Sequence, residues 1–220
     1  MCLLIAYNYN TNNSFTISGS AYGTSWSVTS SEFIADHHHK NIVKIINDID
    51  MVASNYKSDS EVAVINNNTV NNEFIISSHL YKILTIAKEV HIQSDGLYDI
   101  TLGKLSSKMG FSPNFDQDLF HSSNNQFLLQ DKNKLIKYSQ DWFDLSSIAK
   151  GYSVQLIHEY LLKNNLINHL IDIGGEVVIS GNMHGNSWKV GIQDPSSYSD
   201  KPIYIIQNSN KYLSIATSGE

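Results

Sequence analysis

The sequence predicts an α+β fold, with mixed or antiparallel sheets and about three helices. Three segments repeat apolar residues at helical spacing, whereas the other apolar segments are short and lie between turn residues. The helices do not alternate regularly with the strands, which favours α+β over a doubly wound α/β sheet. No internal repeat and no Pro- or Ser-rich linker divides the chain.

The N-terminal part predicts strands followed by a helix. Phe15–Ser20 and Trp26–Thr29 alternate weakly around glycines, which is typical of one strand pair or of one kinked strand. A helix over residues 37–53 follows from Ile42, Ile45, Ile49 and Val52. His37, His38 and His39 begin this helix, and neighbouring helical residues point in different directions, so the three cannot share one metal ion. We expect a solvated helix start there.

The middle of the chain predicts a second helix and a hairpin. The helix follows from Leu80, Ile83, Leu84, Ala87 and Val90, with Ser77 or Ser78 as its N-cap. The asparagines at 66–68 and 71–72 predict a polar loop before it. Phe127–Leu129 and Leu135–Tyr138 predict two strands joined by a turn at Asp131-Lys132-Asn133.

The C-terminal part predicts a third helix and several strands. The helix covers about residues 147–164, with Tyr152, Leu156 and Tyr160 along one stripe. The expected strands are Leu170–Ile173, Glu176–Ser180, Trp188–Gln193, Ile203–Ile206 and Tyr212–Thr217.

Composition narrows the class of protein. The 220 residues carry a net charge of −6 and no basic block, which argues against nucleic acid as a partner. The single cysteine, Cys2, excludes an internal disulfide. Leu3-Leu4-Ile5-Ala6 is too short to span a membrane, so Cys2 is either an ordinary terminal residue or the trace of a lipid anchor. We expect residues 1–14 to be a flexible lead-in and residues 15–220 to form one domain.

The segment Asp144–Tyr152 is the strongest local indication of chemistry. Two serines and Lys150 follow Asp144 where an extended segment passes into a helix. A helix start presents unpaired N–H groups to an anion, and lysine adds a positive charge, so a phosphate group suits this place. The alternative is that Asp144 only caps the helix and Lys150 is solvated.

Two glycine-containing segments allow structural and binding interpretations. Asp95–Asp99 follows the second helix, and Gly96 permits the positive φ of a helix stop. Tyr98 and Asp99 would then project from a loop, where they could contact a heterocycle. Gly174-Gly175 follows a buried strand and marks either a tight turn or a close approach to a ligand.

Several segments together resemble the ApbE family, the FAD:protein FMN transferases. They are Tyr22–Trp26, Tyr56–Glu61 with Ile65-Asn66, Ser94–Gly103, Asp144–Tyr152, Ile171–Glu176, Trp188–Ile192 with Asp194-Pro195, and Ala216–Glu220. They occur in the family's order. The resemblance implies a T-fold-related α+β fold.

The resemblance also implies an activity and a site. Members transfer FMN from FAD to a threonine or serine hydroxyl of a target flavoprotein and release AMP, with Mg²⁺. The FAD contacts that it implies are Tyr22, Tyr56, Leu97, Tyr98, Asp99, Asp144 and Lys150. It implies the backbone carbonyl of Ser147 as one Mg²⁺ ligand. Tyr22 replaces the methionine usual in the family, and Glu176 replaces an aspartate.

Family members continue beyond the segment that resembles Ala216–Glu220, and their further metal ligands lie there. We therefore expect a chain that lacks the C-terminal part of the domain, and an FAD-binding module or an inactive remnant is the alternative to an active transferase. The implied partners are flavoproteins of the sodium-pumping or electron-transfer type. Members are typically exported and lipid-anchored at the periplasmic face of the inner membrane.

Overall fold

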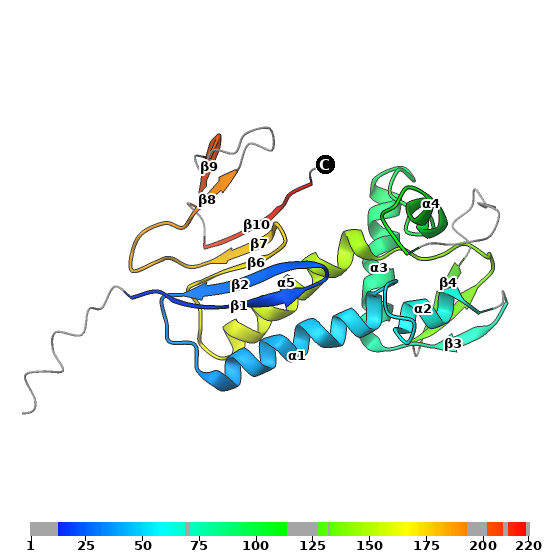
Figure 1. The fold of residues 1–220 in the computed structure, drawn as a ribbon, viewed down its shortest axis with the longest axis horizontal. Helices are drawn as coiled ribbons and strands as arrows, with labels where there is room; N and C mark the ends of the chain where they lie inside the picture. The colour runs from blue at the N-terminus through cyan, green and yellow to red at the C-terminus, as the bar shows by residue number, and fades with distance from the viewer. Residues whose placement is uncertain are drawn as a thin grey trace, which may run out of the picture. The chain divides into compact units, whose positions relative to one another are not determined.

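The computed structural model describes residues 13–68, 71–113, 127–131, 133–192, 202–208 and 211–218. The chain forms two compact units, shown with their elements in Figure 1. Unit 1 comprises residues 1–43 and 154–220, and unit 2 comprises residues 44–153. The boundaries fall inside helices α1 (Asp36–Ala53) and α5 (Ser146–Lys163).

An antiparallel sheet organises unit 1. Its strands lie side by side in the order β1-β2-β6-β7-β10 (Figure 1). Their bounds are Phe15–Ala21 (β1), Thr24–Ser30 (β2), His169–Ile173 (β6), Glu176–Ser180 (β7) and Tyr212–Ala216 (β10). A separate hairpin pairs β8 (Lys189–Ile192) with β9 (Tyr204–Gln207).

Both faces of this sheet bury apolar side chains. On the face that carries Val28 and Ile171, the Trp26 ring contacts His39 of α1, and Val28 and Ile171 are fully buried. On the other face, Val177 and Ile179 pack with Trp188 just before β8. The alternation of side chains along β2, β6 and β7 produces these two buried layers.

The Gly174-Gly175 pair forms the turn between β6 and β7, with φ values of +56° and +90°. A Cβ on Gly174 would lie 2.5 Å from Thr24 Cγ2, and one on Gly175 would lie 2.2 Å from Thr217 Oγ1. The chain itself fills the space beside both glycines. The structure therefore favours a structural turn over a close approach to a ligand.

We expect Gly174→Ala to destabilise unit 1 more than Gly185→Ala does. Both glycines have positive φ, but a Cβ at Gly185 would meet no atom within 4 Å. Gly185→Ala therefore measures backbone strain alone, about 1–2 kcal/mol. Gly174→Ala adds the collision with Thr24, and denaturant unfolding should show the larger loss. Equal losses would contradict the packing argument.

Unit 2 contains the shorter elements. They are α2 (Glu61–Asn66), β3 (Glu73–Ile75), α3 (Ser78–Gln93), α4 (Gly103–Lys108), β4 (Phe127–Gln130) and β5 (Lys134–Lys137). The strands form an antiparallel sheet in the order β3-β5-β4. The N-cap of α3 is Ser77, whose hydroxyl accepts a hydrogen bond from Leu80 N. Leu80, Ile83 and Leu84 are fully buried, as their helical spacing predicts.

The α+β class and the three long helices are confirmed, as are the expected strands within the described residues. The predicted hairpin turn includes Lys132, and Gln193 and Asp194-Pro195 also lie outside the described residues, as does most of the 1–14 lead-in. The sequence patterns missed α2, β3 and α4, which are all short. None of the helices in the described ranges is long and apolar enough to cross a membrane.

Two local expectations were wrong. Asn66 does not lie in a polar loop: it ends α2 and is buried. The start of α1 is not wholly solvated, because His38 is buried and its Nδ1 lies 2.8 Å from the Tyr160 hydroxyl of α5. Burial, helped by the neighbouring His37, lowers the pKa of His38.

Candidate functional site

Asp144 caps α5 from just before the helix. Leu145 is buried, and its carbonyl accepts the first helical hydrogen bonds, from Ile148 and Ala149. A leucine side chain cannot accept a hydrogen bond, so Asp144 supplies the cap: its Oδ1 accepts from Ser146 N at 3.0 Å. The capping interpretation of Asp144 is confirmed, and one N–H at the helix start is already satisfied.

The other carboxylate oxygen of Asp144 faces α4 and the turn after it. Oδ2 accepts a hydrogen bond from Ser106 Oγ at 2.5 Å and lies 3.4 Å from Ser112 Oγ. The backbone N–H of Asp144 donates to Ile100 O at 2.7 Å. Asp144 is thus fixed through both its backbone and its side chain.

Tyr98 and Ser147 lie near Asp144 at the start of α5. The two hydroxyl oxygens lie 3.0 Å apart. Burial raises the pKa of Tyr98, the Ser147 contact opposes this effect, and the nearby Asp144 charge adds to it. Tyr98 therefore stays a neutral hydroxyl at physiological pH, which can donate or accept a hydrogen bond but is a poor base.

The loop that presents Tyr98 begins with a Schellman helix stop. Gly96 N donates to His91 O and Asp95 N donates to Ile92 O, with Asp95 at φ +51°. The sequence therefore located the stop correctly but assigned the key conformation to Gly96 alone. Ser94 Oγ then accepts from Tyr98 N at 3.0 Å, which fixes the next turn of the loop.

The neighbours of Tyr98 differ in their surroundings. Leu97 is 90% exposed, so its side chain offers an apolar surface to solvent or to a ligand. Asp99 turns toward its own chain, because Oδ1 accepts from the N–H and the hydroxyl of Thr101 at 2.8 and 2.7 Å. This oxygen of Asp99 therefore shapes the loop, and Oδ2 is the atom better placed for a ligand.

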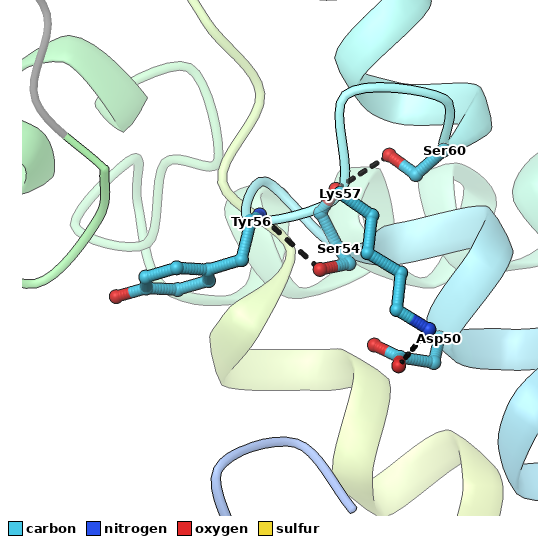
Figure 2. A network of polar contacts seen from close by, with 5 residues as sticks. All are labelled: Asp50, Ser54, Tyr56, Lys57 and Ser60. Atoms are coloured by element: carbon cyan, nitrogen blue, oxygen red, sulfur yellow. Dashed lines mark hydrogen bonds and ion pairs between the residues drawn. The ribbon is translucent and has the colours of Figure 1, made fainter.

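Tyr56 lies in the turn between α1 and α2, which Figure 2 shows from close by. Ser54 Oγ accepts from Tyr56 N at 3.2 Å, and Ser60 Oγ donates to Ser54 O at 2.5 Å. An ion pair of 2.6 Å between Lys57 and Asp50 ties the turn to α1. The Tyr56 ring points away from this network and is 72% exposed (Figure 2).

A cavity of about 240 Å³ adjoins Tyr56 in unit 2. Its lining consists of Asn55, Tyr56, Ser58, Ala63, Asn66, Asn67, Pro113 and Trp142. Three asparagines and a serine contribute polar groups to this lining, with two aromatic rings beside them. The cavity could accept a flat ring with polar edges, although its volume is below the usual range for a complete cofactor site.

The Ser60, Glu61 and Asn66 side chains make structural contacts. Ser60 Oγ accepts from Ala63 N as the N-cap of α2. The Glu61 carboxylate accepts from Ser77 N and Ser77 Oγ, both at 2.6 Å, and so anchors the start of α3. Asn66 Oδ1 accepts a hydrogen bond from Phe143 N at 2.8 Å, and Asn66 Nδ2 donates one to Phe143 O at 2.9 Å. This segment of the resemblance therefore supports the backbone beside Tyr56 and Asp144.

Two predicted contacts remain. Lys150 lies further along α5, and Tyr22 lies in unit 1. Lys150 is half-buried, one turn beyond Ser146. Tyr22 forms the β1–β2 turn with Gly23, and both have positive φ, +53° and +74°. A tyrosine in this conformation is strained, which marks the turn as a candidate for function.

Sequence reasoning missed Ser106 and Asn66 as supports of the site. Both act on segments that are distant in the sequence, 38 residues away at Asp144 and 77 residues away at Phe143. Asn66 lies in a segment that resembles the family, but nothing in the sequence around Ser106 distinguishes it from other serines.

The fold and the site together define an α+β protein with an aspartate-capped helix start beside Tyr98 and Ser147. The chain belongs to the ApbE family, whose model matches residues 22–220.

Relatives support this assignment. The FAD:protein FMN transferase of Haemophilus influenzae is 28% identical over 100% of this chain and 70% of its own length. The Vibrio cholerae protein of the same name is 27% identical over 93% of this chain and 65% of its own length. The chain thus spans about two thirds of these relatives.

Solved structures share the fold. The H257G mutant of the flavin transferase ApbE from Vibrio cholerae has a TM-score of 0.75 at 26% identity, over 84% of this chain and 65% of that one. The ApbE protein of Thermotoga maritima has a TM-score of 0.79 at 24% identity, over 94% of this chain and 71% of that one. The second likeness shows the fold alone.

Proposed function

We propose that this chain is an FAD:protein FMN transferase, which binds FAD and transfers its FMN to a hydroxyl of a target flavoprotein. The observation that carries the proposal is the meeting of Tyr98, Ser147 and Asp144 at the start of α5. These residues belong to the segments that resemble the family, and relatives that match across the chain are named for this activity.

The transfer is a displacement at phosphorus. A threonine or serine hydroxyl of the acceptor protein forms a phosphoester bond with the FMN phosphorus. The pyrophosphate bond of FAD breaks, AMP leaves, and the hydroxyl proton is released. In this proposal the chain's own groups bind and orient FAD, and the acceptor is a flavoprotein of the sodium-pumping or electron-transfer type.

Most of the predicted contacts have a physical role in this proposal. The exposed Tyr56 ring and Leu97 side chain provide apolar surfaces for a heterocycle. Tyr98 and Ser147 offer hydroxyl groups to polar edges, and Lys150 offers a positive charge to the pyrophosphate. Asp144, which also fixes the helix start, and Asp99 belong to the same proposed set in unit 2. Tyr22, in unit 1, is a proposed contact on the resemblance alone.

Magnesium is the other expected component. The Ser147 carbonyl would give it one hard oxygen ligand, and Mg²⁺ would neutralise charge on the transferring phosphate. Within the described residues, no three His, Cys, Asp or Glu side chains gather closely enough to hold a metal ion.

We expect Asp144→Asn and Lys150→Ala each to weaken FAD binding about tenfold, because each removes a charge-assisted contact. Titration of the purified chain with FAD, followed by flavin fluorescence, measures the dissociation constants. Lys163→Ala, which removes an exposed lysine from the last turn of the same helix, is the matched control.

Normal FAD affinity with a lowered melting temperature would leave Asp144 as a helix cap and contradict its role in binding. Transfer is tested separately, by AMP release and by the mass of an acceptor flavoprotein incubated with FAD and Mg²⁺. Binding without transfer would favour the alternative, an FAD-binding module.

A further inference from the structure

We infer that Ser106 is a positioning residue for Asp144, and that α4 with its following turn holds Asp144 and Tyr56 in place for the nucleotide. This inference deepens the proposed function and rests on it for the identity of the ligand. Neither Ser106 nor α4 belongs to the predicted FAD contacts.

Each oxygen of the Asp144 carboxylate accepts a hydrogen bond of normal or short length. Oδ1 is held by Ser146 N at 3.0 Å, and Oδ2 is held by Ser106 Oγ at 2.5 Å. Ser112 Oγ, at 3.4 Å from Oδ2, lies beyond the usual range for a hydroxyl donor. Ser106 is therefore the side chain that fixes the rotation of the carboxylate about its last bond.

The approach of α4 to the segment before Asp144 depends on Gly103. Gly103 N donates to Trp142 O at 2.9 Å, and Leu102 forms a β-bridge with Trp142. A Cβ on Gly103 would lie 2.6 Å from Trp142 O. Only glycine lets the start of α4 pack this closely, and Ser106 then faces Asp144 one turn later.

The end of α4 reaches Tyr56. Phe111 N donates to Ser106 O and Gly110 N donates to Ser107 O, with Gly110 at φ +86°, which is a Schellman stop. This stop turns Phe111 so that its carbonyl accepts a hydrogen bond from the Tyr56 hydroxyl at 3.2 Å. One short helix thus contacts Asp144 through its side and Tyr56 through its C-terminal turn.

Removing the Ser106 hydroxyl should free one oxygen of the Asp144 carboxylate. The carboxylate would then rotate or turn toward water, and the cap on Ser146 would weaken with it. A ligand would have to order this group on binding, which lowers affinity without removing any group that touches the ligand. Ser106→Thr keeps the hydroxyl and should restore the contact.

The test measures FAD affinity and backbone protection on the same purified chains. We expect Ser106→Ala to weaken FAD binding about fivefold, which is less than the loss of about tenfold expected for Asp144→Asn, because Ser106 acts only through Asp144. Ser106→Thr should return to within about twofold of the original chain, and the matched control Ser112→Ala should change affinity by less than about twofold, because its contact is long. In the Asp144→Ala background, which removes both oxygens, Ser106→Ala should have no further effect, since it acts through Asp144.

Hydrogen exchange without FAD provides a second measurement. Ser106→Ala should speed exchange over residues 144–149, and Ser112→Ala should not. If the original chain fails to bind FAD while exchange changes as expected, the proposed function fails and the positioning of Asp144 stands. The positioning role would be overturned if Ser106→Ala left exchange over residues 144–149 unchanged. It would also be overturned if Ser106→Ala lowered FAD affinity equally with and without Asp144 in place.

Discussion

We expect unit 1 to lose stability on the order of 3 kcal/mol as the pH falls from about 6.5 to about 4, because of His169. His169 is fully buried in β6. Burial is the main cause that lowers its pKa from 6.5 to about 4, and nearby His158 lowers it further. The hydrogen bond to the Leu166 backbone and the Glu32 charge act in the opposite direction and raise the pKa. Between these pH values the unfolded chain binds more protons than the folded chain, so acid favours unfolding.

The hydrogen bonds around His169 define its neutral form. Leu166 O can only accept, so His169 donates from Nδ1 at 2.7 Å. His169 Nε2 then accepts from His158 Nδ1, which lies 2.8 Å away. A second proton on His169 would place a positive charge where no water reaches it, which is the physical reason for the acid sensitivity.

Urea unfolding of the original chain and of His169→Gln, repeated across this pH range, measures the effect. The glutamine keeps a donor and an acceptor but does not titrate, so the slope of stability with pH should fall. Identical slopes for the original chain and His169→Gln would rule out His169 as the origin of the acid sensitivity.

Lys137→Met should stabilise unit 2 at pH 7, by about 1–3 kcal/mol. Lys137 lies in β5 and is 1% exposed, and its Nζ has no hydrogen-bond partner among the described residues. Burial lowers its pKa to about 8, Lys104 adds to the effect, and Asp141 opposes it. The Phe143 ring, 5.7 Å from Nζ, compensates only part of the cost of burying this charge.

The pH dependence provides a second check on Lys137. The folded pKa of about 8 lies below the usual 10.5, so the unfolded chain binds more protons between these values. Stability of the original chain should rise with pH across this range, and Lys137→Met should abolish the rise. Lys134→Met, in the same strand, removes only an exposed ion pair with Glu73 and should change stability by less than about 1 kcal/mol. A destabilised Lys137→Met would show that the amine has a favourable partner.

The sequence determined the elements whose information is local. Apolar spacing located α1, α3 and α5, because a helix that packs on one side repeats its buried positions every three or four residues. The cap of α3 was narrowed to Ser77 or Ser78, of which the structure shows Ser77, and the helix stop at residues 94–96 was identified from its glycine. At Asn66, the asparagine-rich segment was wrongly predicted as a loop. An asparagine side chain can hydrogen-bond the backbone of its own loop, but it can equally hydrogen-bond a backbone group far away in the sequence, as Asn66 does at Phe143.

Only the tertiary structure decided which polar groups support the site. Ser106 and Asp144 are 38 residues apart, and Lys137 and His169 acquire their shifted pKa values from burial by segments distant in the sequence. Spacing within one helix or strand does not encode such contacts, since they depend on how closely separate elements pack, as Gly103 packs on Trp142. The sequence by itself therefore determined the fold class, the family and the candidate residues at the start of α5. The packing of unit 2 decided that Asp144 is held by Ser106, because that contact exists only after α4 has packed against the segment that precedes α5.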